Sequence, residues 1–302
     1  MRHVISSSQY TKESLTPLFA LTSKIKNDPS RYSKALQGKV IATLFYEPST
    51  RTRLSFESAI QRLGASLIST ENAKEVSSSV KGESLADTIR IIEGYADAIV
   101  MRHYDNDAAD IASKISAVPI VNAGGGSGEH PTQSLLDCFT ILEHRSSLDN
   151  LSIAAIGDLR YGRTVHSLVK MLSLYDGLTI YGVSLPGLEL SEDYIRYIEE
   201  HGGRFIPCST LAEVPGDVDV LYQTRTQRER MSVSEGEVKE IVINQVVLDG
   251  FANHTIVLHP LPRNQEIAPE VDRDLRALYF EQAKNGMWVR MALLYELFQE
   301  DR

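Results

Sequence analysis

The sequence predicts an α/β protein with two doubly wound parallel-sheet domains that are bridged by two long helices. A length of 302 residues suits two domains of ordinary size. Short apolar runs rich in β-branched residues alternate with segments of helical periodicity, as parallel sheets covered by helices require. The helical segment that begins at residue 133 is apolar nearly all round, which is typical of a helix buried between two domains.

The pattern places the first domain at 1–132, the interdomain helix at 133–150 and the second domain at 151–282. In the first domain we expect helices at 14–25, 54–63, 85–92 and 111–115, strands at 40–46, 98–101 and 120–121, and a Ser-rich loop at 71–84. In the second domain we expect strands at 152–156, 178–183, 204–207, 219–222 and 255–258, a Ser/Gly/Glu-rich loop at 232–238, and a long helical pattern at 277–298. No internal repeat interrupts this order.

The sequence Ser-Thr-Arg-Thr-Arg at 49–53 lies between a strand and a helix. Ser49 or Thr50 is the expected N-cap, and the unpaired N–H groups of a helix start favour an anion. Arg51 and Arg53 are two residues apart, about 200° around a helix, so both cannot face one ligand. We assign Arg51 to the anion and Arg53 to a structural ion pair.

A net charge of −9 argues against nucleic acid as a partner, so an anion site must concentrate its cations locally. The candidate cations are Arg51, Lys81, Arg102, Arg163 and Arg225. No apolar stretch approaches a membrane span and no signal core precedes the first helix. Cys138 and Cys208 are expected to be buried free thiols, which suits a cytoplasmic location. No Cys/His cluster has the spacing of a zinc site, and we expect neither a metal nor a cofactor.

The segment 157–164 nearly spells a phosphate-binding P-loop, with Arg163 where that motif has lysine. A nucleotide-binding protein is therefore an alternative function. The missing ammonium, which contacts the terminal phosphates in such proteins, counts against it.

Several motifs together resemble the aspartate/ornithine carbamoyltransferase family over nearly the whole chain. They are FYEPSTRTRLSFESAIQRLGA at 45–65, VKGESLADTI at 80–89, HPTQ at 130–133, the GD…YGRTVHS spacing from 157, and HPLPR at 259–263. The resemblance implies transfer of a carbamoyl group from carbamoyl phosphate to the α-amino group of an amino acid. It also implies that the last helix, at about 283–302, returns to the first domain.

The resemblance gives each candidate residue a role. It implies that Ser49, Thr50, Arg51, Thr52 and Arg102 hold the phosphate, that Thr52, Arg102 and His130 face the carbonyl oxygen, and that Gln133, Leu261 and Pro262 hold the carbamoyl nitrogen. It implies that Ser77, Lys81, Arg163, Arg225 and Gln227 bind the amino acid, and that Glu47 pairs with Arg163 and Arg230 when the domains close. In this family the loop with Ser77 and Lys81 enters the neighbouring site of a homotrimer.

The acceptor implied by this pattern is L-aspartate, which places the reaction in pyrimidine biosynthesis. Two carboxylates need an arginine pair, here Arg163 and Arg225, and Thr132 and Pro260 stand where ornithine enzymes of the family carry Cys. The alternatives are an ornithine-type or other carbamoyltransferase, and a non-catalytic paralogue that serves as a structural partner. Whether a regulatory chain or a dihydroorotase joins the trimer is left open by the sequence.

Overall fold

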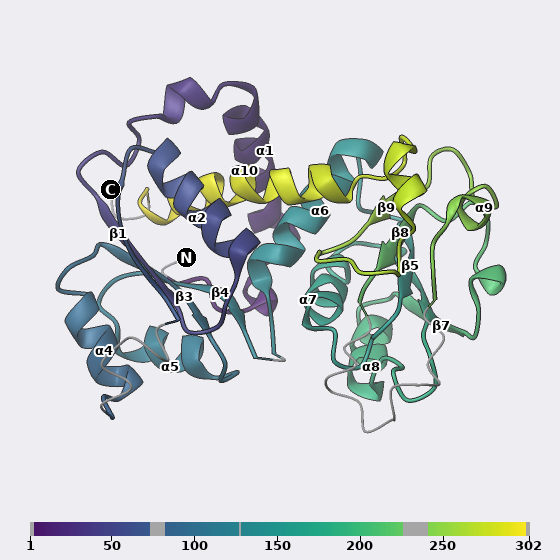
Figure 1. Cartoon of the computed structure of the whole chain (residues 1–302), viewed down its shortest axis with the longest axis horizontal. Helices are drawn as coiled ribbons and strands as arrows, with labels where there is room; N and C mark the ends of the chain where they lie inside the picture. The colour runs from purple at the N-terminus through teal and green to yellow at the C-terminus, as the bar shows by residue number, and fades with distance from the viewer. Residues whose placement is uncertain (1–2, 73–81, 127, 226–240, 300–302) are drawn as a thin grey trace. The chain divides into compact units, whose positions relative to one another are not determined.

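A computed structural model of the chain describes residues 3–72, 82–126, 128–225 and 241–299, and divides into two compact units. Unit 1 comprises residues 1–136 and 284–302, and unit 2 comprises residues 137–283. Both boundaries fall inside helices, α6 (Pro131–Arg145) and α10 (Tyr279–Leu297), so each of these helices has residues in both units. Figure 1 shows the course of the chain through its elements.

Unit 1 contains a four-stranded parallel sheet of order β2-β1-β3-β4. Its elements before α6 are η1 (Ser7–Gln9), α1 (Lys12–Asn27), η2 (Pro29–Tyr32), β1 (Val40–Phe45), α2 (Thr50–Arg62), β2 (Ser66–Glu71), α4 (Leu85–Ile92), β3 (Ala98–His103), α5 (Ala108–Ile115) and β4 (Ile120–Gly125). Successive residues of a strand face opposite sides of a sheet. In β1, Ala42 and Leu44 pack in the core with α4 and α5, whereas Thr43 hydrogen-bonds Glu57 of α2. Helices therefore cover both faces, as a doubly wound sheet requires.

Unit 2 contains a five-stranded parallel sheet of order β7-β6-β5-β8-β9. Its elements before α10 are β5 (Ser152–Ile156), α7 (Arg163–Leu172), β6 (Thr179–Val183), α8 (Glu192–Glu200), β7 (Arg204–Cys208), η4 (Leu211–Glu213), β8 (Val220–Gln223), α9 (Gln245–Leu248), β9 (Ile256–Leu258) and η6 (Pro269–Arg273). Ala154 and Ile156 of β5 pack in one core cluster with Leu248 of α9 and Val271 of η6.

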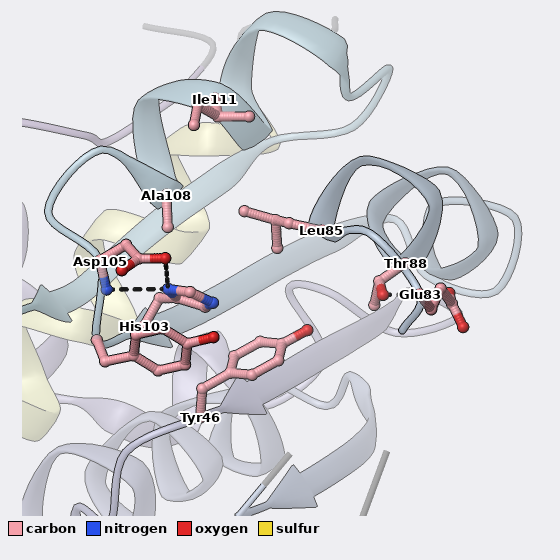
Figure 2. Close-up of a pocket in the computed structure, with 9 residues that line it drawn as sticks. Tyr46, Glu83, Leu85, Thr88, His103, Asp105, Ala108 and Ile111 are labelled. Atoms are coloured by element: carbon pink, nitrogen blue, oxygen red, sulfur yellow. Dashed lines mark hydrogen bonds and ion pairs between the residues drawn. The ribbon is translucent and has the colours of Figure 1, made fainter. Parts of the chain in front are cut away.

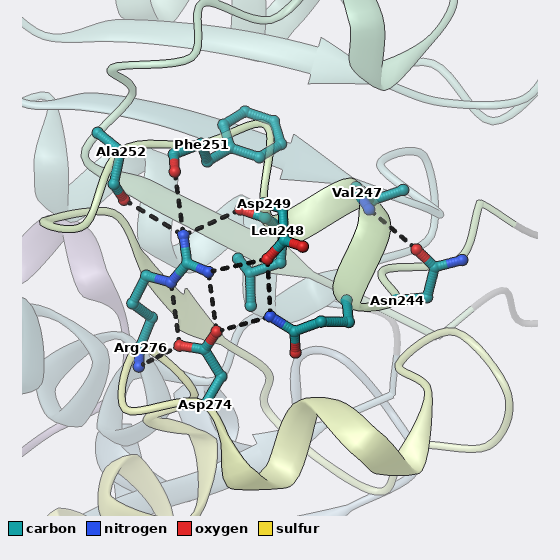
Figure 3. Close-up of polar contacts among 9 residues, drawn as sticks. Asn244, Val247, Leu248, Asp249, Phe251, Ala252, Asp274 and Arg276 are labelled. Carbon is teal, nitrogen blue, oxygen red and sulfur yellow. Dashed lines mark hydrogen bonds and ion pairs between the residues drawn. The ribbon is translucent and has the colours of Figure 1, made fainter.

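Arg276 fixes the short helix α9 to the strand region of unit 2 (Figure 3). Its guanidinium donates to the backbone carbonyls of Leu248 and Phe251 at 2.9 and 3.0 Å, and it pairs with Asp274 at 2.8 Å. The side chain of Arg276 thus caps the C-terminal end of α9, because it donates hydrogen bonds to carbonyls that the end of a helix leaves unpaired.

The predicted fold class is confirmed, with one missed strand. Ser66–Glu71 forms β2, at the edge of its sheet, where the alternation expected of a half-buried strand is broken by the adjacent Leu67 and Ile68. The Ser-rich loop predicted at 71–84 therefore begins one residue later, after Glu71, and its residues 73–81 lie outside the described residues. Cys138 and Cys208 are buried free thiols, as predicted.

Candidate active site

The candidate anion site of unit 1 lies at the carboxyl ends of β1 and β3. The chain passes from β1 to β2 on one side of the sheet and to β3 on the other, so the strand order reverses between β1 and β3. Ligands of open α/β sheets bind at such a reversal. Ser49 and Thr50 follow β1 at the start of α2. Arg102 is the second-to-last residue of β3, one residue beyond the predicted end of that strand.

Arg102 is fixed by two polar side chains that follow β1. Its Nη1 donates to Ser49 Oγ at 3.0 Å, and its Nε lies 3.3 Å from Glu47 Oε2. Ser49 is the N-cap residue of α2, as predicted, but its hydroxyl is used by Arg102 and makes no capping hydrogen bond to the helix. Burial lowers the pKa of Arg102 and the Glu47 carboxylate partly opposes that shift. The guanidinium is therefore preorganised at the helix start.

Arg51 adds a second positive charge at this helix start. Loss of solvent around its guanidinium and, second, the positive charge of Arg102 lower its pKa. An anion between two such cations would relieve their repulsion. Arg53, in contrast, pairs with Glu71 at 2.8 Å and with Glu57 at 3.7 Å, which confirms the predicted structural ion pair.

His130 and Thr52 lie together beside this cluster. Thr52 is buried and its hydroxyl is 3.5 Å from His130 Nε2. Gly124, at a φ of +104°, allows the imidazole to approach, because a Cβ there would lie 3.2 Å from the ring. Gln133 is buried in the first turn of α6, and its backbone N–H donates to the carbonyl of His130 at 2.9 Å. Seven of the predicted carbamoyl phosphate residues thus lie at the carboxyl end of this sheet: Ser49, Thr50, Arg51, Thr52, Arg102, His130 and Gln133.

The N-terminal segment holds Glu129, the residue before His130, and this contact was not predicted from the sequence. Glu129 accepts hydrogen bonds from the hydroxyl of Ser6 at 3.0 Å and from the backbone N–H of Ser7 at 2.6 Å. Val4 pairs with β4, which carries this segment along the edge of the sheet. No local signal could reveal these contacts, because more than 120 residues separate the partners.

A cavity of about 240 Å³ lies in unit 1, between the segment after β1 and the segment after β3 (Figure 2). Its polar lining includes Tyr46, Glu83, His103 and Asp105. The backbone N–H of Asp105 donates to Nδ1 of His103 at 3.0 Å, and burial lowers the pKa of that imidazole. His103 is therefore held as a neutral ring at neutral pH, and it adds no positive charge to those of Arg51 and Arg102.

In unit 2, Arg163 and Arg225 also follow strands that flank a reversal of strand order. The chain passes from β5 to β6 on one side and to β8 on the other. Arg163 is the first residue of α7 and follows β5, and Arg225 follows β8 by two residues. Ile156 pairs with Gln223 at the ends of these strands. Arg163 and Arg225 thus lie in segments that follow the carboxyl ends of two adjacent parallel strands, β5 and β8.

The segment that carries Leu261 and Pro262 follows β9, the strand beside β8. Leu261 is half-buried and Pro262 is exposed. The remaining predicted residues, Ser77, Lys81, Gln227 and Arg230, lie outside the described residues. Within unit 1, Glu47 contacts Arg102, and its pairing with Arg163 and Arg230 when the domains close stays a prediction.

Within the described ranges, no group of three or more His, Cys, Asp or Glu side chains could hold a metal ion. In the same part of the chain, no helix combines the length and the hydropathy that a membrane span needs.

Comparison with known proteins places both units in one family. Residues 2–143 match the family model described as "Aspartate/ornithine carbamoyltransferase, carbamoyl-P binding domain", and residues 149–297 match the "Asp/Orn binding domain" of the same family. A curated relative, the chloroplastic aspartate carbamoyltransferase 1 of Pisum sativum, is 46% identical over 297 residues, which cover 96% of this chain and 77% of the relative.

Solved structures agree with this placement. The catalytic subunit of M. jannaschii aspartate transcarbamoylase has a TM-score of 0.92 and 45% identity, with 99% of each chain covered. Trypanosoma cruzi aspartate transcarbamoylase, in complex with carbamoyl phosphate and aspartate, has a TM-score of 0.88 and 38% identity, with 97% of this chain and 95% of that chain covered. Since both domain models and these relatives span nearly all of the sequence, the chain belongs to the aspartate/ornithine carbamoyltransferase family.

Proposed function

We propose that the chain is an aspartate carbamoyltransferase, which transfers the carbamoyl group of carbamoyl phosphate to the α-amino group of L-aspartate in pyrimidine biosynthesis. The observation that carries the proposal is the cluster of Arg51, Arg102 and the α2 start at the strand reversal of unit 1. The relative from Trypanosoma cruzi, whose structure contains both proposed substrates, supports the same reaction. No cofactor is required, because the phosphate is already a good leaving group.

Carbamoyl transfer makes three chemical demands. The leaving phosphate needs fixed cations and hydrogen-bond donors, which Ser49, Thr50, Arg51 and Arg102 would supply at the start of α2. The carbonyl oxygen needs donors aimed at its developing negative charge, a role for Thr52, Arg102 and His130.

The carbamoyl nitrogen and the attacking amine must also be held in place. In the proposal, Gln133 and the carbonyl of Leu261, with Pro262, hold the nitrogen. Arg163 binds the α-carboxylate of aspartate, and Arg225 with Gln227 binds the β-carboxylate. Gln133 belongs to unit 1, and Leu261, Pro262, Arg163 and Arg225 belong to unit 2. We propose that unit 1 binds the phosphate of carbamoyl phosphate, that unit 2 binds aspartate and contributes the contact to the carbamoyl nitrogen, and that Glu47 contacts Arg163 and Arg230 on closure.

The test is product formation from carbamoyl phosphate and L-aspartate, without any nucleotide and with a chelator present. We expect N-carbamoyl-L-aspartate and phosphate in equal amounts. Replacement of aspartate by L-ornithine is the matched control, and it should give no product because two arginines repel an ammonium side chain. Turnover of ornithine would favour the other branch of the family. A folded chain that turns over neither amino acid would favour the non-catalytic paralogue, and turnover that required a nucleotide would favour the P-loop alternative.

We further propose a homotrimer in which Ser77 and Lys81 serve the site of the neighbouring subunit. In a cyclic ring each interface joins two different faces of the same chain. Arg51→Ala and Lys81→Ala variants, each inactive alone, would be dissociated, mixed equally and reassembled. A site is intact when its own subunit keeps Arg51 and the neighbour keeps Lys81, so about a quarter of wild-type activity should return. No recovery, with mixed trimers confirmed by native mass spectrometry, would contradict a shared site.

The cellular compartment is proposed as cytoplasmic, on the strength of the two buried thiols. The plant relatives carry chloroplastic names, so cell fractionation of the native source is the relevant measurement.

A further inference from the structure

The Leu261 segment contains an unusual backbone conformation. Leu261 has a φ of +52°, in the left-handed region that side chains other than glycine rarely adopt. Such a conformation costs roughly 1–3 kcal/mol and persists only where neighbouring groups impose it. The groups that impose it here therefore fix the course of the main chain at Leu261, whose carbonyl is the proposed acceptor.

His259 makes the contact that holds this backbone. Its Nδ1 accepts a hydrogen bond from the backbone N–H of Leu261 at 2.7 Å. An imidazole nitrogen that accepts a hydrogen bond carries no proton, so the ring proton must lie on Nε2. Nε2 is 2.9 Å from Oε1 of Glu266, which is the acceptor that this tautomer needs.

Glu266 completes the support from the other side of the turn. Its second oxygen accepts from the backbone N–H of Asn264 at 2.9 Å. Burial acts to raise the pKa of Glu266, but the hydrogen bonds from His259 and from backbone N–H groups outweigh it, and the pKa is lowered. His259 and Glu266 are 1% and 2% exposed, so water does not compete for these contacts.

A second set of buried contacts fixes His259 itself. Its backbone N–H donates to Oε1 of Gln282 at 2.8 Å, and Nε2 of Gln282 donates to Oδ1 of Asp137 at 2.6 Å. The hydroxyl of Tyr222 donates to the other oxygen of Asp137 at 2.8 Å. The amide of Gln282 can take only this orientation, since one neighbour is a donor and the other an acceptor. The turn is therefore tied to α10, α6 and β8.

We infer that His259 is a positioning residue for carbamoyl transfer, which orients the carbonyl of Leu261 toward the carbamoyl nitrogen through its Nδ1 and is itself oriented by Glu266. The inference rests on the proposed function of Leu261. His259 touches no substrate in this assignment and acts through the main chain alone. The chemistry it supplies is a fixed acceptor in a water-free turn.

Two substitutions of His259 separate the roles of its two ring nitrogens. In His259→Asn the side-chain oxygen stands near the place of Nδ1 and can still accept from Leu261. In His259→Gln the amide reaches the place of Nε2 and can still contact Glu266, but the acceptor for Leu261 is lost. The two variants are matched, because each removes one hydrogen bond of the same buried side chain.

We expect His259→Asn to keep at least about a fifth of wild-type kcat, the effect of one ordinary hydrogen bond. His259→Gln should lose roughly 10- to 100-fold, as expected for a reacting group displaced by about 1 Å. The two variants should have unfolding temperatures similar to each other. Each should have a KM for aspartate close to that of the wild type. Equal losses in the two variants, or near wild-type kcat in His259→Gln, would overturn the inference.

A measurement without turnover separates this inference from the proposed function. In the wild-type protein, ¹⁵N spectra of His259 should report a proton on Nε2, and hydrogen exchange should show a protected Leu261 amide. That amide should stay protected in His259→Asn and exchange faster in His259→Gln. If the wild type fails to make carbamoyl aspartate yet shows this pattern, the proposed function is wrong and the support of Leu261 by His259 stands. A proton on Nδ1 would overturn the inference even in an active enzyme and even if neither variant folded.

Discussion

Both units carry arginines at the point where the strand order of their sheet reverses, but Arg102 in unit 1 and the segments after α9 and β9 in unit 2 are held by different kinds of polar contact. In unit 1 the contacts act on side chains, since Glu47 and Ser49 hold the guanidinium of Arg102. In unit 2 they act on the main chain. Arg276 holds carbonyls around α9, and His259 holds an N–H in the Leu261 turn.

This difference suits the proposed substrates. A leaving phosphate gains charge, so fixed positive side chains are the feature that stabilises its departure. The carbamoyl nitrogen is a neutral donor, and a backbone carbonyl in a fixed turn is sufficient to accept from it. We therefore expect substitutions in the unit 1 cluster to affect mainly catalysis, and substitutions in the unit 2 contacts to affect stability as well.

Arg51→Ala should give the largest effect. Removal of one preorganised donor from a developing charge costs on the order of 10²–10³ in rate. Arg53→Ala is the matched control from the same helix, because its contacts are the structural pairs with Glu57 and Glu71. Steady-state kinetics should show near wild-type kcat for Arg53→Ala. If Arg51→Ala keeps more than about a tenth of wild-type turnover, Arg51 does not contact the phosphate.

Local sequence was sufficient to predict the ion pairs of Arg53, whereas the anion contact of Arg51 stays a prediction. A strand, a proline and two Thr-Arg pairs predicted where the helix begins. Helical geometry then predicted that Arg51 and Arg53 face different directions. The alternation of strands and helices was likewise sufficient for the fold, except at β2, whose polar edge sequence carries little signal.

The partners of buried polar groups could not be predicted in the same way. Glu129 binds Ser6 and Ser7 near the N-terminus, and Gln282 joins His259 to Asp137, which lies 145 residues before Gln282. Such pairs depend on which elements meet after folding. No spacing or composition encodes them, so the side-chain contacts that orient Arg102 and Leu261 became visible only in three dimensions.

Arg225→Ala should produce the next largest effect and should confine it to aspartate. A charge-assisted contact contributes roughly 1.5–3 kcal/mol, which corresponds to about 10- to 100-fold in the KM for aspartate. Binding of carbamoyl phosphate, followed by calorimetry, should change little. Arg160→Ala, at an exposed position of the same unit, serves as control. A comparable loss of carbamoyl phosphate affinity in Arg225→Ala would argue against one substrate for each unit.

Arg276→Lys tests the main-chain contacts of unit 2 (Figure 3). Lysine keeps the charge but lacks the planar fork that reaches Asp274 and the carbonyls of Leu248 and Phe251 together. We expect a loss of about 1–2 kcal/mol in the free energy of unfolding, measured by urea denaturation. Unchanged stability would show that these contacts do not hold α9 in place.

The smallest expected effect is the response of the Asp274–Arg276 pair to acid. Hydrogen bonds from the Arg276 side chain, the leading cause, hold the pKa of Asp274 well below its ordinary value of 3.8. A carboxylate with a lowered folded-state pKa stabilises the protein above its unfolded-state pKa, and this contribution is lost as the pH falls toward the folded-state pKa. At pH 3 the unfolded chain has taken up most of one proton at Asp274 while the folded chain has not, so about 1 kcal/mol of the contribution should be gone. Asp274→Asn lacks the titrating group and is the reference. The difference in unfolding free energy between wild type and Asp274→Asn should therefore shrink by that amount between pH 7 and pH 3. A constant difference would mean that Asp274 titrates alike in both states, and that the pair holds α9 through shape and not through charge.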